Sequence, residues 1–184
     1  MKKTTPNITP IYQIKVTLRH IKPPIRRRIL VTADTKLGQL HLILQDVMGW
    51  TNSHLHAFRI GLDNYGEPNP DFNDGMKNER NVRLDKIAQE GSKLIYDYDF
   101  GDGWEHDLLI EKIVQTETDA NYPLCLAGKR ACPPEDCGGP PGYLNLLDIL
   151  NDPKHEEYAD MRAWINNEEF DPEYFSVDDA NAVL

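Results

Sequence analysis

The sequence lacks the features that mark exported and membrane-bound chains. No run of eighteen apolar residues occurs among its 184 residues, so no segment predicts a helix that spans a bilayer. Lys2 and Lys3 stand near the start, but no apolar stretch follows them, so nothing resembles a secretory signal peptide. These absences predict a cytoplasmic protein with no membrane partner.

Cysteine is scarce as well. The chain has three cysteines, Cys125, Cys132 and Cys137, an odd number that does not predict the disulfide framework of a small secreted domain. Their spacing contains no C-x-x-C pair, and a zinc site would need a fourth ligand from elsewhere, such as a histidine. We interpret them as structural or free thiols.

Positive charge is in deficit overall but concentrated near the start. The net charge is −10, yet residues 1–40 hold nine Lys and Arg and one acid, a local charge of +8. An acidic protein is repelled by phosphate backbones, which disfavours non-specific nucleic-acid binding. The local basic patch consists of Arg19, Lys22, Arg26, Arg27 and Arg28. We expect this patch to pair with acids elsewhere in the chain, the alternative being a local contact with nucleic acid.

The hydrophobic pattern that is present predicts an α+β fold. Residues 12–18, 25–31 and 54–60 alternate as half-buried strands do, and residues 37–48 carry the apolar stripe of one early amphipathic helix. Residues 61–81 and 119–142 are rich in polar residues, Gly and Pro, and predict a long loop and an irregular segment. Helices are expected over 142–150, 154–166 and 176–184. We therefore predict a flexible tail over 1–10 and a single domain over 11–184, with an antiparallel or mixed β-sheet and a C-terminal helical segment.

The stretch YDYDFGDGWEHDL, residues 96–108, predicts a β-hairpin. A three-residue loop over 101–103 would pair Phe100 with Trp104 and Tyr98 with His106, which keeps one face apolar. His106 then lies on the aromatic face. This geometry conflicts with a metal site built from His106 and the acids of the other face.

The same register crowds four acids on the second face of the hairpin. Asp99 would stand opposite Glu105, and Asp97 opposite Asp107. Like charges in opposite positions destabilise a sheet by a few tenths to about 1 kcal/mol per pair. We expect solvent, a divalent cation such as Mg²⁺ or Ca²⁺, or the arginines of residues 25–31 to offset this repulsion.

Three motifs together resemble the plasmid ORF-three-like family, first noted on an agrobacterial Ri plasmid. The motifs are YDYDFGDGWEH, HLHAF and CPPEDCGGPPGY, and the resemblance spans residues 12–184. Some members of that family are labelled as passenger proteins of insertion elements, and the family has no established activity. The resemblance therefore implies no catalytic roles, but it favours as binding candidates Asp99, Asp102, Trp104, His106, Glu135 and Asp136.

Two functions from different classes follow. We favour a binding or interaction module associated with mobile elements and with a protein partner. The alternative is a metal-dependent hydrolase of the phosphoesterase kind, in which a metal acidifies a water molecule. Its candidate metal ligands are His54, His56, Asp97, Asp99 and His106.

Overall fold

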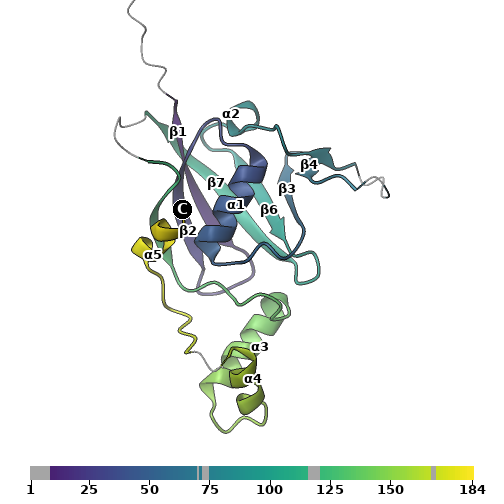
Figure 1. Ribbon diagram of the computed structural model, residues 1–184, viewed down its shortest axis with the longest axis vertical. Helices are drawn as coiled ribbons and strands as arrows, with labels where there is room; N and C mark the ends of the chain where they lie inside the picture. Colours follow the sequence, from purple (N-terminus) through teal and green to yellow (C-terminus); the bar gives the residue numbers. More distant parts are fainter. Residues whose placement is uncertain (1–8, 70, 72–74, 116–120, 167–168) are drawn as a thin grey trace, which may run out of the picture.

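The computed structural model describes residues 9–69, 71, 75–115, 121–166 and 169–184 (Figure 1). Most of the tail expected over 1–10 thus lies outside the described residues. The strands are β1 Ile11–Leu18, β2 Arg26–Thr32, β3 His56–Ile60, β4 Asp63–Gly66, β5 Lys77–Asn78, β6 Lys93–Tyr98, β7 Trp104–Val114 and β8 Leu124–Lys129. The helices are α1 Leu37–Met48, α2 Leu84–Ile87, α3 Gly139–Asn151, α4 Tyr158–Trp164 and α5 Val177–Val183.

All of these strands join one mixed sheet in the order β5-β4-β3-β6-β7-β1-β2-β8. Neighbouring strands run antiparallel except β4 and β5, which run parallel. The predicted α+β single domain with a mixed sheet is confirmed.

Helix α1 lies across one face of this sheet (Figure 1). Its apolar stripe is buried, including Leu37, Leu40 and Leu44, because these positions recur every three or four residues. The helix ends at Gly49, whose φ of 85° is the left-handed conformation that glycine adopts at little cost. The early amphipathic helix is therefore confirmed.

The hairpin forms, but its predicted register is wrong by two residues. Tyr98 pairs with Trp104, Tyr96 with His106 and Asp97 with Glu105. The loop thus spans the five residues 99–103. A shift of two keeps every strand residue on its predicted face, because side chains alternate with a period of two.

Asp99 is the residue that ends β6 early. Its φ of 53° is left-handed, and its backbone oxygen accepts a hydrogen bond from Gly103 N at 2.6 Å. Its carboxylate accepts bonds from the backbone N–H groups of Gly101 and Asp102, at 3.0 and 3.3 Å. Asp99 therefore leaves the acidic face on which the sequence placed it and is buried, with 7% of its surface exposed.

Three short strands were missed by the sequence analysis. The segment expected as a loop contains β4 and β5, and residues 70 and 72–74 lie outside the described part. The segment expected to be irregular contains β8, which pairs with β2 at the sheet edge. Residues 116–120 also lie outside the described part of the chain. Strand β5 has two exposed residues, too few to show any alternation.

The predicted C-terminal helical segment is confirmed, and its helices lie in two separate places. Helices α3 and α4 pack together away from the sheet, whereas α5 lies beside β8 (Figure 1). The loop before α3 reaches back to the end of α1, where Trp50 Nε1 donates to the Pro133 carbonyl at 2.9 Å. Within the described residues, no helix has the length and apolarity needed to cross a bilayer.

Candidate functional site

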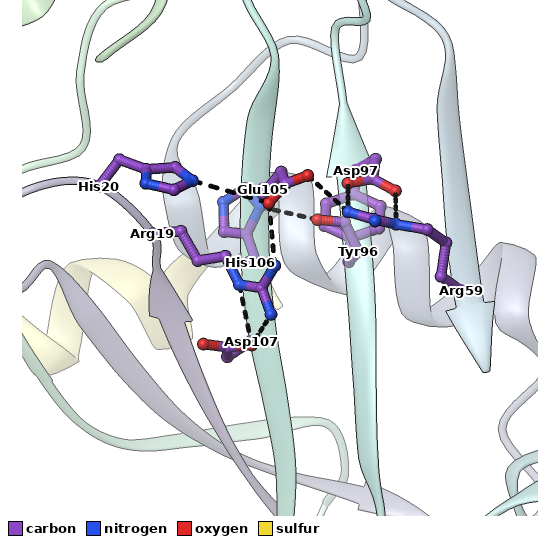
Figure 2. A network of polar contacts seen from close by, with 8 residues as sticks. All are labelled: Arg19, His20, Arg59, Tyr96, Asp97, Glu105, His106 and Asp107. Atoms are coloured by element: carbon purple, nitrogen blue, oxygen red, sulfur yellow. Dashed lines mark hydrogen bonds and ion pairs between the residues drawn. The ribbon is translucent and has the colours of Figure 1, made fainter. Parts of the chain in front are cut away.

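The face of the sheet away from α1 carries a ladder of ion pairs (Figure 2). Arg59 holds Asp97 with two hydrogen bonds of 2.7 and 2.8 Å and reaches Glu105 at 2.6 Å. Arg19 forms one ion pair with Glu105 at 2.9 Å and another with Asp107 at 2.6 Å. These bonds lower the pKa of Glu105, with Arg19 the largest cause. We call this set of five residues the outer ladder.

Arginines offset the acid repulsion, but the expectation that they come from residues 25–31 is wrong for the hairpin acids. Arg19 and Arg59 serve the hairpin acids, while Arg28 of the predicted segment binds Glu111 through two bonds of 2.7 and 2.9 Å. The Arg28 guanidinium lowers the pKa of Glu111 to about 2. The acids left on this face are thus neutralised within the chain.

The basic patch is divided rather than continuous. Arg27 is buried, its Nε donates to the Val47 carbonyl at 2.7 Å, and its guanidinium lies 4.1 Å from the centre of the Phe175 ring. Lys22 and Arg26 are exposed. Because Arg19 and Arg28 pair with acids, the patch does not present a single cationic surface.

His106 and Trp104 lie in the core beneath α1. His106 has no exposed surface, and its Nδ1 lies 3.2 Å from the Tyr96 carbonyl, to which it donates. Burial lowers the pKa of His106 to about 4, so the imidazole is neutral at pH 7. The structure separates His106 from Asp97, which lies on the opposite face of the hairpin.

A second histidine group forms a wall beside the first turns of α1. The rings of His41 and His56 stack with centroids 3.5 Å apart, and His56 Nε2 lies 3.1 Å from both carboxylate oxygens of Glu79. Both ring nitrogens of His41 are bonded, to Tyr96 Oη and Asn52 Oδ1, each at 2.7 Å. Burial and the neighbouring His56 lower the pKa of His41 to about 4. Glu79 is 6% exposed, so its carboxyl group is held away from bulk water.

This wall lines a hollow of about 830 Å³, which we call the α1 hollow. Its lining comes from the start of α1, from residues 52–56, and from segments 67–69 and 76–80. Leu42, Leu55 and Phe100 also line it, and 50%, 67% and 56% of their surfaces are exposed. The lining residues are therefore mostly polar, with apolar side chains at the edge, and the volume of the hollow lies within the range of small-molecule sites.

A third group stands at the hairpin tip. His54 Nε2 lies 3.7 Å from Asp99 Oδ2 and 3.2 Å from Asp136 Oδ1, and ligand-type atoms of all three side chains lie within 4.8 Å of one another. His54 also lines the α1 hollow. We call this group the His54 cluster.

The neighbouring candidates Asp102 and Glu135 hold the cluster in place. Asp102 Oδ2 accepts a bond from Gly138 N at 3.1 Å, and Glu135 accepts bonds from the Tyr98 hydroxyl and from Thr51. Hydrogen bonds on both sides of Asp136 thus tie its loop to the hairpin and to the segment after α1.

The structure brings together some predicted site residues and separates others. His54 and Asp99 of the predicted metal ligands meet Asp136 of the predicted binding residues, whereas His56 joins Glu79 instead. His41 and Glu79 were missed as site residues. Glu79 stands alone in a polar loop and gives no sequence signal, and His41 occupies a position on an ordinary helical stripe.

The cysteines are free thiols, as expected. Burial raises the pKa of Cys132 and raises that of Cys137 to about 12. Both therefore stay protonated at pH 7, and a protonated thiol is a poor nucleophile.

Comparisons with known proteins agree on the family and the fold. The family model described as plasmid pRiA4b ORF-3-like protein matches residues 10–179. The uncharacterized protein y4hQ of Sinorhizobium fredii is 40% identical over 166 residues, which cover 89% of this chain and 85% of that relative. The crystal structure of MM3350, a protein of unknown function from Methanosarcina mazei, aligns with a TM-score of 0.86 and 37% identity over 93% of this chain and 97% of that one. These descriptions assign no activity to either relative.

Proposed function

The chain belongs to the plasmid pRiA4b ORF-3-like family, and from this premise we propose that it is a binding module whose ligand site is the α1 hollow. The observation that carries the proposal is the wall of His41, His56 and Glu79, of which His41 and Glu79 are buried, facing a hollow of about 830 Å³. Sites for small molecules have volumes of roughly 300–1,000 Å³, with a few fixed polar groups among apolar ones. The hollow near Val31 and Tyr122 has a volume of about 330 Å³, at the lower end of that range.

The lining indicates a ligand with an apolar body and a nitrogen donor. His56 donates to Glu79, but each carboxylate oxygen has a second lone pair that accepts from another donor. Leu42, Leu55 and Phe100 provide apolar contact at the edge. An aromatic or alkyl amine satisfies both requirements, because its ammonium group is attracted to the buried carboxylate.

Thermal unfolding with small amines tests this proposal. We would compare benzylamine and phenethylamine with benzoate, in which a carboxylate replaces the amine. At ten times its Kd, a ligand that binds only the folded state stabilises it by about 1.4 kcal/mol, which raises Tm by about 4 °C in a chain of this size. We expect the amines but not benzoate to raise Tm, and Glu79→Gln to remove the effect.

Matched leucines provide the control. Leu42 on α1 lines the hollow and Leu144 on α3 does not, and 50% and 45% of their surfaces are exposed. Leu42→Ser should weaken amine binding, while Leu144→Ser should leave it unchanged. Equal binding to wild type and Glu79→Gln, or amine-induced NMR shifts confined to residues outside the hollow, would overturn the proposal.

A metal-dependent hydrolase is the second candidate function. The His54 cluster favours it, because the cluster holds ligand-type atoms at the edge of the same hollow. Hydrolysis would need a metal there to acidify a water molecule. The cytoplasmic location, the protein partner and the association with mobile elements stay predictions.

A further inference from the structure

The His54 cluster joins three segments that are far apart in the sequence. His54 precedes β3, Asp99 begins the hairpin loop, and Asp136 lies in the loop before α3. The backbone N–H of Asp99 donates to the Leu55 carbonyl at 2.9 Å, which fixes the hairpin tip against the histidine segment. With Asp102 and Glu135 holding the third segment, the three side chains are positioned before any ligand arrives.

A buried imidazole nitrogen in this cluster lacks a hydrogen bond, and a carboxylate oxygen faces it. His54 Nε2 is buried and, although it lies 3.2 Å from Asp136 Oδ1, it forms no hydrogen bond with any of the described residues. The Asp99 side chain is nine-tenths buried, and its Oδ1 takes both loop N–H groups, which leaves Oδ2 facing His54 at 3.7 Å. A buried imidazole nitrogen left without a hydrogen bond costs free energy, unless something binds to it.

The absence of a neutralising cation distinguishes this cluster from the outer ladder. Within the described part of the chain, no Lys or Arg side chain lies within ion-pair distance of Asp99 or Asp136. The two carboxylates thus share one imidazole. A bound cation would neutralise them where the protein's own side chains do not.

The distances fit a metal ion. Metal–ligand bonds of about 2.1 Å place neighbouring ligand atoms roughly 3.0–3.5 Å apart in octahedral or tetrahedral geometry. His54 Nε2 lies 3.2 Å from Asp136 Oδ1 and 3.7 Å from Asp99 Oδ2, so small rotations of the side chains would complete the site. One imidazole with two carboxylates suits zinc, manganese or iron better than calcium, which takes oxygen ligands.

We propose that His54 Nε2, Asp99 Oδ2 and Asp136 Oδ1 bind one divalent transition-metal ion. Three protein ligands leave coordination positions open for water or a ligand, as in catalytic rather than structural sites. The Asp136 side chain is 69% exposed and His54 lines the α1 hollow, so the open positions are accessible. This inference does not rest on the amine ligand proposed for the hollow.

Titration of untagged, chelator-treated protein with Zn²⁺ and Mn²⁺ tests the site. We expect one equivalent to bind, with a rise in Tm, and Co²⁺ to give the visible absorption of an ion with nitrogen and oxygen ligands. Asp99→Asn is the sharpest variant, because the asparagine oxygen still accepts the two loop N–H bonds while the charge on the other atom is lost. Loss of a ligand should weaken binding at least about tenfold, because even the partners that orient metal ligands contribute about 10–100-fold.

Four further variants separate this site from adventitious binding. Asp136→Asn should weaken metal binding as Asp99→Asn does, whereas Asp107→Asn on the outer ladder and His155→Gln, which changes a histidine near α4, should not. Glu79→Gln should abolish amine binding and leave the metal in place, so the two proposals fail separately. The metal proposal is overturned if wild type binds no stoichiometric metal, or if Asp99→Asn and Asp136→Asn bind it as wild type does.

Discussion

On the outer face of the sheet, Asp97, Glu105 and Asp107 all contact a guanidinium group, whereas at the tip of the same hairpin Asp99 contacts an imidazole. The outer acids lie on regular strand positions within reach of Arg19 and Arg59. Asp99 lies where β6 has ended, on a left-handed residue whose carboxylate faces His54. An acid neutralised by arginine holds the sheet together, and an acid left facing a histidine is available to a cation.

The largest effect is expected from a substitution that separates the hairpin tip from the loop before α3. A Cβ at Gly139 would overlap the backbone oxygen of Asp102, and the φ of 68° at this position disfavours any side chain. Overpacking and left-handed backbone strain together predict that Gly139→Ala lowers the free energy of unfolding by about 4 kcal/mol. Urea unfolding measures this loss.

Gly103 is the matched control for Gly139. Its φ of 69° is nearly the same, and a Cβ there meets nothing within 4 Å. Gly103→Ala should therefore lower the free energy of unfolding only by the cost of the left-handed backbone, about 1–2 kcal/mol. Metal binding should be weakened in Gly139→Ala and kept in Gly103→Ala, and equal losses of stability would show that the contact with Asp102 is unimportant.

The two faces should also lose stability in different pH ranges. Burial lowers the pKa of His106 to about 4, while an unfolded histidine has a pKa near 6.5. Between these values the unfolded chain binds the additional proton, so stability falls as the pH falls from about 6.5 to 4, by about 3 kcal/mol for this residue. Glu111 on the outer face has a pKa of about 2, so its contribution to the free energy of unfolding is lost only as the pH falls from about 4.5 to 2.

Unfolding free energies of wild type and His106→Gln, measured from pH 7 to pH 3, check this difference. The variant should be less stable at pH 7 because a packed core residue has changed, but its stability should vary less with pH between 6.5 and 4. Parallel curves in that range would mean that His106 is not the group that takes up the proton.

How far the sequence predicts these two faces can be seen in the hairpin. Alternation placed Trp104, His106 and Leu108 inside and Glu105 and Asp107 outside, because that pattern depends only on the period of a strand. The loop length could not be read from it, since a five-residue loop and a three-residue loop keep the same faces. The left-handed conformation of Asp99 decides between them, and it depends on the carboxylate bonds within the loop.

The partners of the cluster were harder to predict than its chemistry. His54 and Asp99 were recognised as ligand types, but Asp136 meets them only because the 130–138 segment returns to the end of α1 through Trp50 and Glu135. Such contacts between irregular segments leave no periodic signal. The same reason explains why Glu79 was missed. Arg59, rather than an arginine of residues 25–31, neutralises Asp97 because β3 pairs with β6, and the alternation within each strand does not reveal which strands are neighbours.

A smaller effect is expected on the outer ladder when Arg59 is replaced. Arg59→Met keeps the apolar stem but leaves Asp97 directly opposite Glu105 with one fewer guanidinium. The loss of a partly buried bidentate pair and the new repulsion predict a cost of about 1–2 kcal/mol. Urea unfolding at low salt and in 1 M NaCl should show that the cost shrinks with salt, because these charges reach solvent. A cost independent of salt would point to lost packing instead.

The smallest effect is expected for Asp107→Asn. The Asp107 side chain is 55% exposed and Arg19 keeps its bond to Glu105, so the free energy of unfolding should change by less than about 0.5 kcal/mol. Asp107→Asn and Asp99→Asn make the same chemical change on one hairpin, and the comparison of the two faces predicts opposite results. Titration with Zn²⁺ should give wild-type affinity for the first and at least about tenfold weaker binding for the second. If both variants bind Zn²⁺ equally, the pairing of acids with arginine on one face and histidine on the other does not determine where a cation binds.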